Sequence, residues 1–507
     1  MEANEDFSKL LLKKSLTVNL DQIQQRLGNS PDVVIRECRP ALMRKTRVAL
    51  VYIDGLVDSV AANDFIMESL MYDVSEQAIV HIKSSEQFYW YAKESLLASI
   101  HVQSDVLNYG QLFSLLFSGN VIFLIDNYNK ALAISATGWK ERAIDEPTSE
   151  TVIRGPKQGF TENLRTNTAL IRRKIKSPDL WMENFVIGRV TQTNVSIMYI
   201  KGIADDAVIE ELRTRLNKID TDSILESGYI EEFIEDQKWT PFPTLYNTER
   251  PDVISAELLE GKIAIIVDGT PFVLVIPAVF AAFFHSAEDY YHRRDISTLV
   301  RLLRFIGNII GLLGPATYVA IGSFHPEMIP RQLFLSLAAQ REDLPFPAFI
   351  EAILMELVFE ILREASIRMP RNIGQAMSIV GSIVLGTAAV QAGFVSPAIV
   401  IVVSITAIAS FVIPSTDMAI SIRLLRFPFI LLAASFGIFG IILGMIALLL
   451  HLVSLRSFGV PYMAPFAPFD AQGQKDTLFW RASLKSMVFR PKFIAKGNLV
   501  RRRNRKK

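Results

Sequence analysis

The feature that most constrains the fold of this chain is a run of 45 residues, 372–416, without a charged side chain. Uncharged segments also occur at 305–324 and 427–450. A helix needs about 20 apolar residues to cross a hydrocarbon core of about 30 Å. Residues 1 to 270 have the mixed charge of an ordinary globular sequence. We therefore expect a soluble region followed by a helical membrane domain.

The soluble half contains an internal repeat. VALVYIDGLVD (48–58) aligns with VSIMYIKGIAD (195–205), and GNVIFLIDNYNKALAISA (119–136) aligns with GKIAIIVDGTPFVLVIPA (261–278). Each copy begins with a β-branched strand and ends in two strands joined by a polar turn, with an amphipathic helix such as 206–216 between them. We predict two related α/β subdomains with mixed sheets.

The repeat and the first apolar run set the expected domain boundaries. We expect a variable N-terminal segment (1–30), two soluble α/β subdomains (31–145 and 146–285), a helical transmembrane domain (286–455) and a basic C-terminal tail (456–507). The transmembrane domain should hold about four to six membrane segments.

Charge is concentrated at the C-terminal end. The net charge is +1, yet eleven Lys or Arg residues and no acidic residue follow Asp476. Such segments stay on the cytoplasmic side and attract anionic lipid headgroups. We expect a cytoplasmic tail that contacts membrane lipid and no binding of nucleic acid. The single cysteine, Cys38, excludes an intrachain disulfide and fits a reducing compartment. MEANEDFSKLLLKK is no secretory signal, so the N-terminal domain is expected in the cytoplasm.

Acidic residues follow three predicted strands, at Asp54, Asp126 and Asp268. Aspartate is common in turns because its side chain bonds nearby backbone groups. We favour this structural interpretation over a catalytic one.

A second polar cluster has the spacing of metal ligands on one helix face: His285, Glu288, Asp289 and His292. We favour a charged helix face at the membrane boundary over a metal site. The sequence contains no Walker loop, CxxC or HExxH motif, which are the short motifs of phosphate, redox and zinc sites. We therefore predict no enzyme activity, no cofactor and no metal.

One long segment, PAFIEAILMELVFEILREA (347–365), could span a membrane but is charged. It carries Glu351, Glu356, Glu360 and Arg363, the last three on one helix face. A charge at the bilayer centre costs at least about 2.5 kcal/mol, so these side chains must face protein or water. Two interpretations stay open: a polar lining that attracts ions, or a structural Glu–Arg network or amphipathic helix at the membrane surface.

The membrane segments pose a parity problem. Four arginines (Arg293, Arg294, Arg301 and Arg304) precede 305–324, and Arg423 and Arg426 precede 427–450; these charges favour a cytoplasmic side. If 305–324, 347–365, two helices in 372–416, and 427–450 all cross, the basic tail falls outside. We expect an even number of crossings, with 271–284 as a candidate for partial insertion.

Small residues recur every four positions in GQAMSIVGSIVLGTAAVQAG. They are Gly374, Ser378, Ser382 and Gly386. Helices in lipid associate through close backbone approach, so this face should contact another helix. A second face carries Val380, Val384, Thr387 and Gln391. A ring of such helices could line a pore with Val380 or Val384 as a hydrophobic gate; packing inside a monomeric bundle is the alternative.

The chain resembles the A-subunit family of spore germination receptors. The resemblance runs from about residue 35 to 465. It is carried by VIRGPKQGFTENLRTNTALIRRKIK (152–176), VDGTPFVLVIPAVFAAFFHSAEDYY (267–291), FIEAILMELVFEILREASIRMP (349–370), IVGSIVLGTAAVQAGFVSP (379–397) and IRLLRFPFILLAASFG (422–437).

The resemblance implies a subunit of a nutrient receptor in the spore inner membrane. Its implied partners are a transporter-like, nutrient-sensing B subunit and a lipoprotein C subunit. The resemblance also implies that the A subunit assembles into a ring and forms a nutrient-gated channel for monovalent cations. A secondary transporter and a non-conducting scaffold are the alternatives. A transporter should show a repeat in its membrane half, and we find one only in the soluble half.

Overall fold

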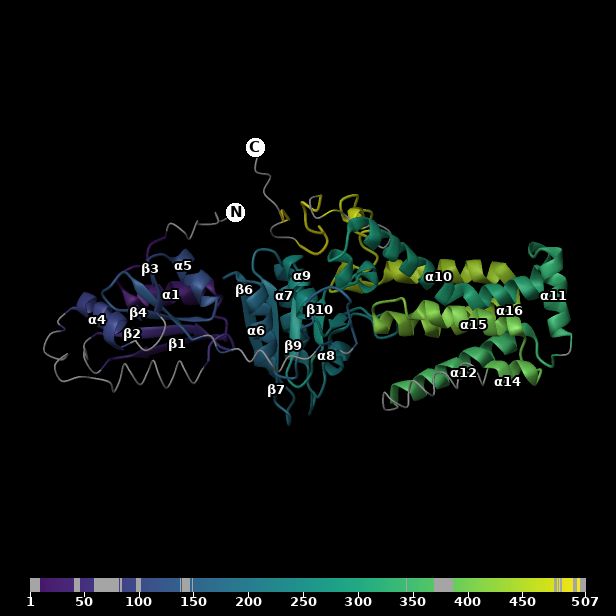
Figure 1. Cartoon of the computed structure of the whole chain (residues 1–507), viewed down its shortest axis with the longest axis horizontal. Helices are drawn as coiled ribbons and strands as arrows, with labels where there is room; N and C mark the ends of the chain where they lie inside the picture. The colour runs from purple at the N-terminus through teal and green to yellow at the C-terminus, as the bar shows by residue number, and fades with distance from the viewer. Residues whose placement is uncertain are drawn as a thin grey trace. The chain divides into compact units, whose positions relative to one another are not determined.

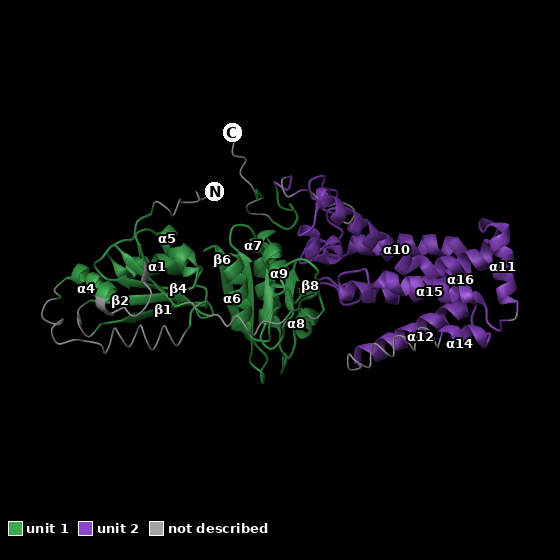
Figure 2. Ribbon diagram, viewed as in Figure 1, with its two compact units in different colours: residues 1–235, 247–277, 489–507 green, residues 236–246, 278–488 purple. Residues whose placement is uncertain are grey.

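The computed structural model divides into two compact units (Figure 2), one formed by 1–235, 247–277 and 489–507 and the other by 236–246 and 278–488. The structure describes residues 10–40, 46–58, 82, 84–96, 102–136, 138, 146–147, 149–342, 344–368, 386–477, 481, 483, 486–495 and 499–501.

The first sheet of unit 1 has the strand order β1-β2-β4-β5-β3 (Figure 1). Its elements are α1 (Leu16–Arg26), β1 (Val33–Cys38), β2 (Val48–Ile53), α4 (Ser85–Tyr91), the π-helix η3 (Ala92–Leu96), β3 (Val102–Val106), α5 (Tyr109–Leu116), β4 (Asn120–Ile125) and β5 (Ala131–Ser135). Strands β2 and β4 are wholly buried, because the apolar side chains on both faces are covered by helices.

The second sheet has the equivalent order, β6-β7-β9-β10-β8. Its elements are α6 (Leu164–Lys174), β6 (Leu180–Ile187), β7 (Thr193–Ile200), α7 (Asp206–Lys218), α8 (Ser227–Ile234), β8 (Tyr246–Thr248), α9 (Pro251–Leu259), β9 (Ile263–Val267) and β10 (Val273–Ile276). The predicted amphipathic helix is α7, and β9 and β10 are the strands around the predicted polar turn. The two equivalent sheets are the structural counterpart of the sequence repeat.

The expectation of mixed sheets was wrong for the first sheet. Each neighbouring pair in the first sheet is antiparallel, and so are the pairs β6-β7, β7-β9 and β9-β10 in the second. The physical reason is the connection length. The turns between β4 and β5 and between β9 and β10 are too short for the crossover that parallel strands need.

Residues 10–30 of the predicted N-terminal segment contribute to the first subdomain. Helix α1 buries Leu16, Leu20 and Ile23, and these side chains pack in one cluster with residues of β2, including Val51. The opposite face of the sheet is covered by Phe88 of α4 and its neighbours. The first sheet therefore lies between two apolar layers.

The predicted partial insertion of 271–284 was wrong. Residues Val273–Ile276 form the buried strand β10, which pairs with β9. Residues Phe280–Phe284 form the short 3-10 helix η5, in which Phe283 and Phe284 are buried. The segment is apolar because it fills protein cores on both sides of Pro277.

Unit 2 is mainly helical. Its described α-helices are α10 (Arg294–Phe324), α11 (Arg331–Arg341), α12 (Ala348–Arg368), α14 (Gly386–Gln391), α15 (Pro397–Ser410) and α16 (Thr416–Ser454). Short elements are η6 (Ala287–Tyr290), η7 (Pro326–Met328), β11 (Arg456–Ser457), β12 (Val460–Pro461) and η9 (Gly473–Lys475). Two of the described helices, α10 and α16, are long and apolar enough to cross a membrane.

Helix α16 is not the single span predicted at 427–450. Gly437 has φ 60° and ψ −141°, outside the helical region, and the helix folds back on itself there. Ser421 Oγ donates to Pro241 O, and His451 lies 2.9 Å from Thr240 Oγ1. A straight helix would separate residues 421 and 451 by about 45 Å, yet they reach adjacent residues. The limbs, 416–436 and 438–454, therefore form an antiparallel hairpin.

Glycines on α10 form a close contact face within unit 2. A Cβ added to Gly307 would lie 3.6 Å from Ala409 O, and one on Gly314 would lie 2.8 Å from Thr406 Oγ1, both on α15. This is the small-residue packing expected of helices in lipid.

Candidate functional site: buried ion pairs in the helical unit

The predicted glutamate helix is α12, and its central carboxylate forms a buried ion pair. Glu356 and Arg426 of α16 are joined by an ion pair, and each side chain is 1% exposed. Arg426 Nε also donates to Gly311 O of α10, at 2.8 Å. One guanidinium therefore connects three helices.

Two further contacts extend this pair along α12. Glu351, fully buried, accepts a hydrogen bond from Ser396 N at 2.9 Å, immediately before α15, where the positive end of a helix favours a carboxylate. Its other oxygen lies 3.6 Å from Arg341 Nε. Glu360 Oε1 lies 3.6 Å from Arg423 Nε of α16.

Arg363 completes the series: its guanidinium lies 5.6 Å from the centroid of the Phe411 ring. We call the set Glu351, Glu356, Glu360, Arg363, Arg423 and Arg426 the charge ladder. All four polar residues predicted on α12 belong to it. A Glu–Arg network is thus present in unit 2, and the polar-lining interpretation stays a proposal.

Several polar atoms of the charge ladder have no hydrogen-bond partner among the described residues. They are Glu351 Oε1, Glu356 Oε1, Glu360 Oε1, Arg363 Nη1, Arg423 Nε and Nη1, and Arg426 Nη2. An unsatisfied buried polar group costs about 1–3 kcal/mol. The ladder therefore has hydrogen-bonding capacity that a second arrangement of its pairs could use.

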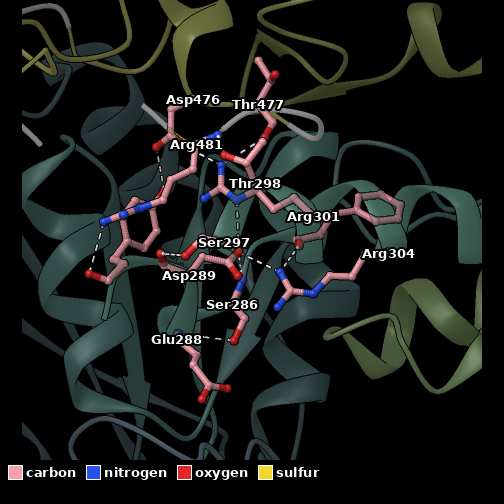
Figure 3. Close-up of polar contacts among 12 residues, drawn as sticks. Ser286, Glu288, Asp289, Ser297, Thr298, Arg301, Arg304, Asp476, Thr477 and Arg481 are labelled. Atoms are coloured by element: carbon pink, nitrogen blue, oxygen red, sulfur yellow. Dashed lines mark hydrogen bonds and ion pairs between the residues drawn. The ribbon is translucent and has the colours of Figure 1, made fainter. Parts of the chain in front are cut away.

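A second cluster lies where α10 begins, around Asp289 (Figure 3). Its carboxylate oxygen Oδ2 accepts from Arg301 Nε at 3.1 Å and from Arg304 Nη1 at 2.7 Å. Burial raises the pKa of the Asp289 carboxyl, but the Arg304 hydrogen bond and both guanidinium charges outweigh it and hold the pKa below its ordinary value. Asp289 therefore neutralises two arginines at the entry of the helix.

The same cluster binds residues 476 and 477, which follow α16 in the chain (Figure 3). Arg301 Nη1 donates to Asp476 Oδ1 at 2.6 Å and to Thr477 O at 3.0 Å. Arg301 and Arg481 lie 5.4 and 5.6 Å from the centroid of the Tyr290 ring. We call this set, with Asp289 and Arg304, the α10 anchor.

The predicted ligand-like residues near α10 are engaged with other protein groups. Glu288 pairs with His292 at 2.9 Å, and Asp289 pairs with Arg301 and Arg304. Within the described part of the chain, no group of three or more His, Cys, Asp or Glu side chains is placed to hold a metal.

The three strand-end aspartates have structural contacts in unit 1. Asp54 pairs with Arg165. Asp126 Oδ1 accepts from the backbone N–H of Leu16 at 3.0 Å, and Asp268 Oδ1 accepts from that of Leu164 at the same distance. The partners of Asp126 and Asp268 are helix starts more than 100 residues away in sequence, not the local turns expected.

The predicted pore helix is only partly described. Five of its singled-out residues lie outside the described residues: Gly374, Ser378, Val380, Ser382 and Val384. A Cβ on Gly386 would lie 3.6 Å from Val400 of α15. Thr387 and Gln391 are exposed in the single chain.

Sequence reasoning missed the partners of the glutamates. The sequence predicts flanking cytoplasmic charges at four arginines that the structure buries and pairs with acidic residues: Arg301, Arg304, Arg423 and Arg426. The available signal was two arginines three residues apart in one apolar segment and two glutamates, Glu356 and Glu360, four residues apart in another.

The chain therefore combines two α/β repeats with a helical unit that contains buried ion pairs. Two of its described helices are long and apolar enough to cross a membrane. The model of the Bacillus/Clostridium GerA spore germination protein family matches residues 21–493. The chain belongs to this family, and its relatives include A-type subunits of spore germination receptors.

Individual relatives agree over nearly the whole length. Spore germination protein KA of Bacillus subtilis (strain 168) is 50% identical over 495 residues, 97% of this chain and 89% of the relative. Spore germination protein GerLA of Bacillus cereus is 39% identical, over 98% of this chain and 100% of the relative. One solved structure is also similar: the crystal structure of the N-terminal domain of the A subunit of the Bacillus megaterium spore germinant receptor GerK3. Its sequence is 44% identical to this chain, the match covers 53% of this chain and 97% of that chain, and the TM-score is 0.43.

Proposed function

We propose that this chain is the membrane subunit of a nutrient germinant receptor and that several copies form a nutrient-gated channel for monovalent cations. The observation that carries the proposal is the charge ladder, in which the Glu356–Arg426 ion pair is buried among apolar helices. Ionisable groups at membrane depth are costly and mark ion pathways or the elements that gate them. Opening of the channel would release cations and start germination.

The pore would be lined by the predicted helix 374–391, of which the structure describes α14. The proposed lining residues are Val380, Val384, Thr387 and Gln391, and the proposed packing residues are Gly374, Ser378, Ser382 and Gly386. The exposure of Gln391 in the single chain supports this arrangement, because an amide in lipid needs a polar partner or water. A ring of subunits would provide both.

The proposed assembly contains a transporter-like B subunit and a lipoprotein C subunit. The chain would reside in the spore inner membrane, with the N-terminal domain and the basic tail in the cytoplasm. The fold-back at Gly437 supports this orientation. Counting α16 as two crossings turns the five predicted crossings into six, an even number.

Potassium release from cells that make this chain with its partner subunits tests the proposal. We expect Val384→Ala to leak potassium without nutrient, because a smaller side chain weakens a hydrophobic gate. Gly386→Leu should prevent assembly and abolish release. Saturable solute uptake without leak would indicate a transporter instead. Absence of conductance in wild type and Val384→Ala, at normal membrane levels, would indicate a scaffold.

A further inference from the structure

Pro315 lies inside α10 and leaves one carbonyl group without its helical partner. In an α-helix, the N–H of residue i donates to the carbonyl of residue i−4, and proline has no N–H. The carbonyl concerned is that of Gly311, which is buried. Such a group needs another donor.

Arg426 supplies that donor. Its Nε lies 2.8 Å from Gly311 O, and its Nη1 pairs with Glu356. Gly311 has no side chain to separate the two helices: a Cβ there would lie 3.9 Å from Ile422 of α16. The proline of α10, the arginine of α16 and the glutamate of α12 therefore form one connected unit.

We infer that Arg426 is a positioning residue that holds α12 against the proline site of α10, and that this tie stabilises the closed state of the channel. The inference rests on the proposed function. According to this inference, a contact within one subunit sets the equilibrium between the closed and open states of the channel.

The charge ladder offers a defined second arrangement. Glu356 and Glu360 are one turn apart on α12, and Arg423 and Arg426 are about one turn apart on α16. The observed pairs are Glu356 with Arg426 and Glu360 with Arg423. A slide of one turn, about 5.4 Å, would place Glu360 against Arg426. Glu360 Oε1 makes no hydrogen bond in its pair with Arg423, and Arg426 Nη2 has no hydrogen-bond partner among the described residues, so both atoms can serve that pair.

Arg426 has two arms, the ion pair with Glu356 and the hydrogen bond to Gly311 O. The first experiment weakens each arm separately. Cells make the full chain with its partner subunits, and potassium efflux is measured without nutrient at equal membrane levels. Glu356→Gln removes the charge of one arm. Pro315→Ala restores an N–H that competes with Arg426 for Gly311 O. We expect each variant to raise the basal efflux several-fold.

A matched control lies on the same helix. Glu364 forms an exposed pair with Arg368, at 2.6 Å, and Glu364→Gln should leave the efflux unchanged. Basal efflux from Glu356→Gln equal to that of wild type would overturn the inference.

The double variant separates a common tie from two independent defects. If both arms act through one guanidinium, Glu356→Gln with Pro315→Ala should leak less than the product of the two single effects. Efflux that multiplies would show independent contributions and overturn the inference.

A variant that does not accumulate is replaced by the charge exchange Glu356→Arg with Arg426→Glu. The exchange keeps the ion pair, but a glutamate at 426 has no donor for Gly311 O. The inference requires that this chain reaches the membrane and still leaks; a tight channel overturns it.

Wild-type release on addition of common amino acids and glucose shows that the channel works. If the wild-type chain shows no such release, the result counts against the proposed function. If wild type releases potassium normally and the variants do not change the basal efflux, the result counts only against the role of Arg426.

Discussion

The Asp268 carboxylate accepts a hydrogen bond from the backbone N–H of Leu164, 3.0 Å away and 104 positions earlier in the chain. Asp126 makes the equivalent bond to Leu16 in the other subdomain. Each carboxylate lies after a central strand and binds the first residue of the helix that opens its repeat. The repeat therefore conserves a tie between a sheet and a helix start, where negative charge is stabilising.

Removal of this tie should destabilise its own subdomain. We expect Asp268→Ala to lower the free energy of unfolding by about 1–2 kcal/mol, because one helix N–H loses a charged acceptor. The measurement is the thermal unfolding of the purified full chain in detergent. Asp206 pairs with Lys201 on the surface, and Asp206→Ala should have little effect. An equal loss in both variants would contradict the assignment.

The stability of unit 1 should depend on pH through Glu150. Burial raises the pKa of the Glu150 carboxyl to about 7, although a hydrogen bond from Thr248 and the charge of Arg250 lower it. The folded chain then holds a proton that the unfolded chain releases at lower pH. Stability is therefore full below the unfolded pKa near 4.5 and falls by at most about 3 kcal/mol as pH rises to about 7.

Glu150→Gln should remove that dependence. The melting temperature of the wild-type chain should decrease between pH 5 and pH 7 by more than that of the variant. Glu146, exposed and paired with Lys157 at 3.0 Å, provides the control Glu146→Gln. A wild-type slope that persists in Glu150→Gln would assign it to another group.

The soluble region could be anticipated from sequence because its signals are local. Helix α7 and the turn at Gly269 follow from apolar periodicity and turn chemistry. The order of the strands in each sheet could not, since the pairing of β2 with β4 and of β7 with β9 is decided by contacts between segments far apart in sequence.

The helical unit was anticipated less completely. Length and composition predicted α10, but the fold-back of α16 depends on one glycine, Gly437, within an apolar stretch that reads as continuous. The partners of Glu356 and Asp289 depend on which helices are neighbours. Apolar periodicity shows that such charges must be paired, and only the packing shows that Arg426 and Arg304 pair with them.

The α10 anchor should be essential for folding of unit 2. Asp289→Asn would leave Arg301 and Arg304 buried with less compensating charge, and loss of one partner from a buried pair costs about 3–5 kcal/mol. We expect a large drop in the amount of chain in the membrane, measured by immunoblot. The control is Asp295→Asn, since Asp295 pairs with Arg293 at 3.3 Å on the exposed start of α10. Normal levels of Asp289→Asn would contradict this role of the α10 anchor.

The hairpin in α16 predicts which residues face the same side of the membrane. A Cβ on Gly437 would lie 3.0 Å from Phe324 Cβ, so the fold-back lies beside the C-terminal end of α10. In a Cys38→Ser background, cysteines at Thr416 and Ser454 should react with a membrane-impermeant maleimide from one side, and a cysteine at Met328 from the other. A single straight crossing would instead place Thr416 and Ser454 on opposite sides. Gly437→Ala should reduce the amount of chain in the membrane, because positive φ disfavours side chains and the added methyl group meets Phe324.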